Sequence, residues 1–338
     1  MVSSQLLSLK DFIVIGERRV NPHIAAAEAQ LSALCKQYNI ILPTYAGYTS
    51  MAPYIYPRAS IDRMVTIGLI MNMFFYIDDA INDDQFAEAD LDARNLFTNC
   101  ARIVITGQRP MEQHRLYDVS QEIHRRLSDQ ASPAYINRFA KSALEYLKNT
   151  TVAINELQRP DGIIDIDRFI HWRERISGMG PTITLLELAN SFELPQHVLD
   201  TPFMRHIFKI VSRIGGLGND IWSYHKECVV EGGRLNFVHV LIENANLSVA
   251  EAVHEAIRYV NRHITEFLEM EKNPPRWEDD STNLLVDAYL EGLREVILAT
   301  YHWQMETNRY RSPHHPIPEL RHMLPENPHV SPALLRQA

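Results

Sequence analysis

Three oxygen-bearing side chains recur at four-residue spacing in residues 218–227. On an α-helix, positions i, i+4 and i+8 share one face, so Asn219, Ser223 and Glu227 would form a ladder of an amide oxygen, a hydroxyl and a carboxylate. Such hard oxygen donors suit Mg²⁺. Lys226 follows Asn219 by about two turns and adds a cation beside the ladder. The pattern predicts a face that binds a metal-bound diphosphate.

An acidic cluster far upstream strengthens this interpretation, because a ladder of Asn, Ser and Glu alone is also common on solvated helix faces. Residues 78–84 contain four aspartates, directly after the most apolar run of the chain, residues 64–77. Carboxylates this close repel one another unless water or cations separate them. Two oxygen clusters at the rim of a helical bundle would suit Mg²⁺ ions that bind a diphosphate and act as Lewis acids on the leaving group.

Composition excludes several other classes. The chain has 338 residues and a net charge of −9, without a Lys/Arg run, which argues against a nucleic-acid partner. Its three cysteines lack metal-ligand or disulfide spacing. The apolar run at 64–77 is too short to span a bilayer, and the N-terminus lacks a signal-peptide pattern. We therefore expect a reduced, cytoplasmic protein without stable membrane insertion.

The elements that must position these residues are helices. Apolar periodicity predicts one all-α domain over residues 1–311, with an irregular lead-in at 1–20 and a structured loop at 41–57. A Pro- and His-rich tail, residues 312–338, is expected to lie unpaired or draped. Glycines and a proline at 178–181 should break one helix inside the core. The expected helices are 25–37, 60–77, 87–106, 111–128, 133–157, 165–176, a segment resuming to 188, 199–228, 248–270 and 282–307.

The two motifs resemble those of class I terpene synthases. Asp78-Asp79 with Asp83 is similar to the family's aspartate-rich metal motif, although its usual third acid position holds Asn82 here, followed by Asp83 and Asp84. The segment from Asn219 to Glu227 matches the second metal motif at Asn219, Ser223 and Glu227 and at the cation Lys226. The resemblance extends over most of the chain, and implies a helical bundle with a central apolar cavity and three Mg²⁺ ions.

The same resemblance implies roles for other residues. Arg175 looks like the family's diphosphate-sensing arginine, and Gly178 with Met179 like the helix-break positions whose backbone triggers ionisation. Arg309 and Tyr310 look like the terminal pair that hydrogen-bonds diphosphate, and the mouth is expected to close through residues 229–236 and the region around Arg309. Phe74, Phe75 and Trp303 could line the cavity and stabilise a carbocation, although core packing alone would also explain each aromatic residue.

The implied activity is Mg²⁺-dependent cyclisation of an isoprenyl diphosphate to a cyclic hydrocarbon or alcohol. The C15 substrate, farnesyl diphosphate, is favoured, and the C20 substrate, geranylgeranyl diphosphate, is the alternative. A chain-elongating prenyltransferase normally carries two aspartate-rich motifs, which the Asn/Ser/Glu ladder argues against. A non-catalytic helical scaffold would not need cations such as Arg175, Lys226 and Arg309 converging on one anion. A homodimer is possible for this fold.

Overall fold

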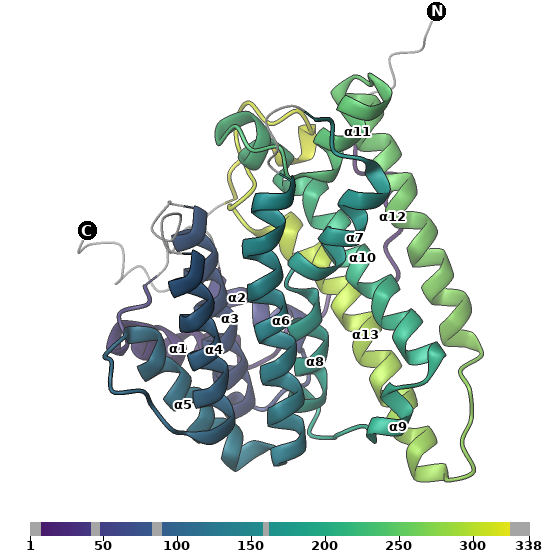
Figure 1. Ribbon diagram of the computed structural model, residues 1–338. Helices are drawn as coiled ribbons and strands as arrows, with labels where there is room; N and C mark the ends of the chain where they lie inside the picture. Colours follow the sequence, from purple (N-terminus) through teal and green to yellow (C-terminus); the bar gives the residue numbers. More distant parts are fainter. Residues whose placement is uncertain (1–7, 42–47, 83–89, 158–161, 325–338) are drawn as a thin grey trace, which may run out of the picture.

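The computed structural model describes residues 8–41, 48–82, 90–157 and 162–324, and within these ranges all regular structure is helical, as predicted (Figure 1). The helices pack into one bundle, with α10 contacting α7, α8, α12 and α13. Their bounds are α1 Ile24–Gln37, α2 Tyr48–Ile55, α3 Ile61–Asn82, α4 Asp90–Thr106, α5 Arg115–Gln130, α6 Pro133–Leu157, α7 Ile166–Ile176, α8 Met179–Ala189, α9 Gln196–Leu199, α10 Pro202–Tyr224, α11 Phe237–Ala245, α12 Val249–Lys272 and α13 Asp280–Glu306.

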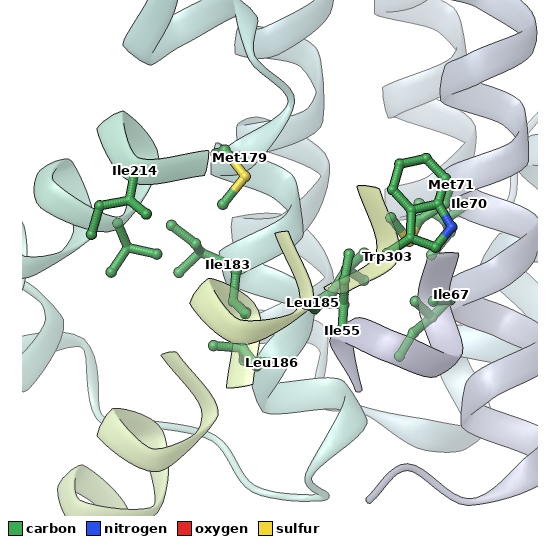
Figure 2. Close-up of a cluster of buried hydrophobic side chains, with 14 of the residues drawn as sticks. Ile55, Ile67, Ile70, Met71, Met179, Ile183, Leu185, Leu186, Ile214 and Trp303 are labelled. Atoms are coloured by element: carbon green, nitrogen blue, oxygen red, sulfur yellow. The ribbon is translucent and has the colours of Figure 1, made fainter. Parts of the chain in front are cut away.

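Two helices lie at the centre of the bundle and are buried on nearly every side. Residues 64–73 of α3 are all buried, and so is every residue of α8 except Gly180. Apolar side chains surround both helices, as expected of helices that other helices enclose. Figure 2 shows Ile55 of α2, Leu185 of α8 and Trp303 of α13 among the side chains gathered in this core. The described residues contain no helix long and apolar enough to cross a membrane.

Local signals fix where the two long helices beside the cavity begin. At the start of α10, the Thr201 hydroxyl accepts a hydrogen bond from the Met204 amide at 3.3 Å, and Pro202 occupies the first turn. At the start of α13, the Asp279 carboxylate accepts from the amides of Ser281 and Thr282. Helix α10 continues into a π-helix, η2 (His225–Val230), which carries the last part of the predicted metal motif.

The structure adds helices α2, α9 and α11 to those that the sequence predicts. The expected loop at 41–57 contains helix α2, which tolerates Pro53 because burial of Ala52 and Ile55 offsets one lost backbone hydrogen bond. Helix α11 was not predicted. In the expected tail, residues 312–324 pack against the bundle and bury His315, Ile317 and Leu320, the last in the short 3-10 helix η3 (Pro318–Leu320). Residues 325–338 lie outside the described ranges.

Candidate active site

A cavity of about 180 Å³ opens between the central helices and the helix break. Charged and polar residues line it together with apolar side chains of α2, α3, α8 and α13. We call six of the polar lining residues the mouth: Asp78, Arg173, Asn219, Glu227, Arg309 and Tyr310. The apolar lining residues, which include Met51, Ile55, Met71 and Leu185, are called the base.

A larger, open groove of about 920 Å³ lies beside α5, but its chemistry is different. Its wall contains Glu122, whose carboxylate already pairs with Arg125 and Arg126 at 2.7 Å. Surface charges that already pair with one another do not point together at a bound metal or anion. The enclosed cavity is therefore the candidate site, because both predicted motifs reach it.

The oxygen ladder is held together by a residue that the sequence did not single out, Asn236. Its amide nitrogen donates to the backbone oxygen of Asp220 at 2.9 Å, the Ser223 hydroxyl at 3.3 Å and the Glu227 carboxylate at 3.0 Å. Ser223 and Asn236 are fully buried. The structure thus brings Ser223 and Glu227 to one face, although the helix changes to π geometry between them.

Asn219 stands at the centre of the mouth. Its amide oxygen accepts a hydrogen bond from Arg173 at 3.1 Å, while its amide nitrogen donates to Gln304 at 3.0 Å and to the Tyr310 hydroxyl at 2.9 Å. Arg173 also forms an ion pair of 2.6 Å with the buried Asp220. Burial raises the pKa of the Asp220 carboxyl, and the Arg173 guanidinium opposes that rise.

Arg175, the predicted diphosphate sensor, does not reach the cavity, and the prediction is wrong on this point. Its side chain is exposed and its guanidinium donates to the backbone oxygen of His171 at 2.6 Å. Arg173, two residues earlier on α7, lines the cavity instead, with a side chain only 14% exposed. Two residues on an α-helix differ by about 200° in direction, so only one of these arginines can face the cavity.

The predicted helix break lies between α7 and α8. Gly178 has a φ of 72°, a left-handed conformation that glycine adopts without steric cost, and it lines the cavity with Met179. Its carbonyl already accepts from the Thr182 amide at 3.2 Å and hydroxyl at 2.9 Å. The break can lie close against α10 because residue 216 is glycine. A Cβ there would approach the Cβ of Ser177 to 2.9 Å, closer than carbon atoms pack.

The acidic cluster is described only in part. Asp78, near the end of α3, lines the cavity across from the α10 ladder. The backbone of Asp79 continues α3, but its side chain lies outside the described part of the structure, as do Asp83 and Asp84 altogether. The structure therefore places one carboxylate of this motif at the mouth.

The predicted aromatic residues line the cavity. Phe74 and Phe75 lie one turn before Asp78, and Trp303 packs edge-on against Tyr310 with ring centroids 6.2 Å apart. Tyr146, which the sequence did not single out, also lines the cavity and makes an edge contact with Phe74 at 5.5 Å. Aromatic faces can stabilise a positive charge held near them.

The two remaining predicted cations differ in placement. Arg309 lines the cavity, and its guanidinium lies 5.7 Å from the ring centroid of Tyr310. Lys226 is not among the lining residues, and its ammonium pairs with Glu231 at 2.6 Å. The nearby carboxylates of Glu231 and Glu227 help to raise the pKa of Lys226 against the effect of burial, so it is a cation at neutral pH.

The donor set fits a hard divalent cation. Asn219, Ser223 and Glu227 present an amide oxygen, a hydroxyl and a carboxylate, the ligand types that Mg²⁺ accepts alongside water and phosphate. Within the described residues, no three His, Cys, Asp or Glu side chains gather in a metal-binding group. The described residues therefore do not form a soft metal site rich in thiolates or imidazoles.

Comparison with known proteins supports the same interpretation. The family model for terpene synthase family 2, C-terminal metal binding, matches residues 69–266. Sesquiterpene synthase Agr1 of Cyclocybe aegerita is 25% identical over 259 residues, covering 75% of this chain and 72% of that protein. Silphinene synthase peniA of Penicillium patulum is 22% identical over 306 residues, covering 86% of this chain and 81% of that protein.

Solved structures share the fold. The crystal structure of a-eudesmol synthase superposes with a TM-score of 0.74 at 22% identity, covering 87% of this chain and 98% of that one. Linalool/nerolidol synthase from Streptomyces clavuligerus gives a TM-score of 0.72 at 20% identity, covering 87% and 99%. The helices are thus arranged as in known structures of this architecture.

Proposed function

The chain belongs to terpene synthase family 2, and we propose that it converts farnesyl diphosphate to a cyclic sesquiterpene in a magnesium-dependent reaction. It is a terpene synthase, a lyase that acts on an isoprenyl diphosphate, and its matched domain is metal binding. The observation that carries the proposal is the mouth, where Arg173, Asn219 and Tyr310 are joined by hydrogen bonds at the opening of an apolar cavity.

The mouth is suited to bind the diphosphate and to stabilise its departure. Arg173 and Arg309 line the opening, and charge builds on the leaving oxygen as the allylic C–O bond breaks. Asp78, Asn219, Ser223 and Glu227 would hold magnesium, with Asp79 and Asp83 as further proposed ligands. Bound magnesium would neutralise the diphosphate and act as a Lewis acid on it.

The base is suited to the hydrocarbon chain. Its apolar side chains exclude water, which would otherwise capture the carbocation. The aromatic rings of Phe74, Phe75 and Trp303 face the space that the carbocation would occupy. We propose that the base accommodates the C15 chain rather than the C20 alternative. The named sesquiterpene synthases among the relatives favour the same length.

The test is incubation of the purified protein with geranyl, farnesyl or geranylgeranyl diphosphate, each with Mg²⁺ or with EDTA, followed by gas chromatography and mass spectrometry. We expect a cyclic C15 product from farnesyl diphosphate that disappears with EDTA. A cyclic C20 product alone would replace farnesyl by geranylgeranyl diphosphate in the proposal. Absence of any hydrocarbon or alcohol product would overturn the cyclase assignment.

A further inference from the structure

A second ion pair joins α7 to α10 outside the cavity. The Glu174 carboxylate lies 2.5 Å from Nε of Arg213, and the two side chains are only 13% and 23% exposed. Neither of them lines the cavity. Glu174 directly follows Arg173, whose guanidinium pairs with Asp220, also on α10. Adjacent residues of α7 therefore attach that helix to α10 at two points.

The two ion pairs have opposite polarity. At position 173, α7 supplies the cation and α10 the anion, whereas at position 174 α7 supplies the anion and α10 the cation. Adjacent residues of an α-helix point about 100° apart, so the two pairs hold α7 from different directions. A rotation that carried Glu174 toward the buried Asp220 would bring two carboxylates together, which their repulsion opposes. The charges thus favour one rotation of α7 about its axis.

This rotation decides which arginine of α7 reaches the mouth. Arg173 lines the cavity, while Arg175 is exposed. Apolar packing gives α7 little help in choosing between them, because only Phe169 and Ile170 of its 11 residues are buried. Its polar contacts must therefore contribute to its orientation, and the pair formed by Glu174 is well placed to do so.

We propose that Glu174 and Arg213 are positioning residues, which set the rotation of α7 and thereby hold Arg173 at the mouth to bind diphosphate. This inference rests on the proposed function and deepens it. The donors of a guanidinium lie in one rigid plane, so they meet phosphate oxygens well only from a defined direction. Loss of the Glu174–Arg213 pair should therefore weaken diphosphate binding without removing any group that lines the cavity.

Calorimetric titration with inorganic diphosphate in the presence of Mg²⁺ tests the proposal without depending on the hydrocarbon chain or on turnover. Glu174→Gln keeps the size of the side chain and removes its charge, and we expect it to raise the dissociation constant by about 10-fold. Arg213→Gln should have a similar effect. The double variant should resemble either single variant, because all three lack the same ion pair.

Glu271→Gln is the matched control. Glu271 pairs with Arg294 between α12 and α13, with side chains 18% and 33% exposed, and neither residue lines the cavity. The same chemical change is thus made in an ion pair of the same residue types at similar burial. A thermal melt should show comparable losses of stability in Glu174→Gln and Glu271→Gln, whereas Glu271→Gln should leave diphosphate affinity within about 2-fold of wild type.

Unchanged diphosphate affinity in a folded Glu174→Gln or Arg213→Gln variant would overturn the inference. An equal loss of affinity in Glu271→Gln, or additive losses in the double variant, would overturn it as well. A wild type that binds diphosphate with Mg²⁺ but forms no terpene from any substrate would instead overturn the proposed function, while the variants would still report on the positioning of Arg173. The two failures are therefore distinguishable.

Discussion

The mouth and the base of the cavity are built in different ways. In the mouth, Asn219 alone makes hydrogen bonds to Arg173, Gln304 and Tyr310, and each bond requires a particular donor and acceptor. In the base, Met51, Ile55 and Leu185 contribute apolar surface without directional bonds. Substitutions in the mouth should therefore change whether the reaction occurs, while substitutions in the base should change which substrate or product is favoured.

The largest effect is expected from Asn219→Leu. The change removes a proposed metal ligand and three hydrogen bonds from the centre of the mouth, so kcat/KM should fall by on the order of 10³-fold. Product formation is measured by gas chromatography, with a thermal melt as the control for folding. A folded variant that keeps a tenth of the wild-type activity would contradict the role given to Asn219.

Arg173 and Arg175 form a matched pair on one helix. Arg173→Lys keeps a positive charge opposite Asp220 but loses the planar guanidinium that also reaches Asn219, so we expect a loss of about 10²-fold in kcat/KM. Arg175→Lys, on the exposed face, should stay within about 2-fold of wild type. Equal losses in the two variants would show that the choice of Arg173 over Arg175 is wrong.

Asn236→Ser tests whether the mouth depends on a residue behind it. A serine hydroxyl can still cap α11 but is too short to reach both Ser223 and Glu227. We expect the half-saturating Mg²⁺ concentration to rise by about 10-fold, with a smaller change in kcat at saturating metal. A fall in kcat with unchanged Mg²⁺ dependence would argue against this positioning role.

Gly216 and Gly218 provide a smaller test of the contact between α10 and the helix break. Gly216→Ala would push a methyl group into Ser177 and displace the break, so kcat/KM should fall by about 10-fold. Apart from the adjacent residues and the backbone of α10 itself, no atom lies within 4 Å of a Cβ placed on Gly218. Gly218→Ala should therefore leave kcat/KM nearly unchanged, and a comparable loss there would weaken the argument from close approach.

The smallest effect on activity is expected from the C-terminal segment, residues 312–324, which lines neither the mouth nor the base. Burial lowers the pKa of His315 to about 4, with His225 and Arg321 acting in the same direction, while the Ile317 amide donates to its Nδ1 at 3.0 Å. The unfolded state therefore binds a proton first as pH falls below the ordinary pKa of 6.5. The free energy of unfolding is therefore highest above pH 6.5, and it falls by roughly 2–3 kcal/mol as the pH approaches 4.

Urea unfolding at pH 7 and pH 4.5 measures this difference. His315→Gln should reduce the loss of stability on acidification, since glutamine does not titrate. An identical pH dependence in wild type and variant would exclude His315 as its source.

The sequence predicted those features that repeat along one helix. Asn219, Ser223 and Glu227 could be recognised because their spacing is regular, and α3 because its apolar run is long. Whether Arg173 or Arg175 faces the cavity depends on how α7 is rotated about its axis where it meets the helix break. The number of residues between each arginine and Gly178 does not determine that rotation. Asn236 reaches the ladder across a loop, and no local pattern marks such a contact. Helix α2 was missed because its Pro, Gly and Tyr neighbourhood resembles a loop.

The ion pair between Arg173 and Asp220 also bears on how the protein is assembled. A guanidinium supplied by α7 already compensates the buried carboxylate of α10, so this part of the mouth is balanced by the chain's own charges. Small metal domains that fold around their ion lack such an internal counterion and unfold under chelation. We therefore expect folding and metal loading to be separate events, so a chelator should stop turnover while leaving the melting temperature nearly unchanged.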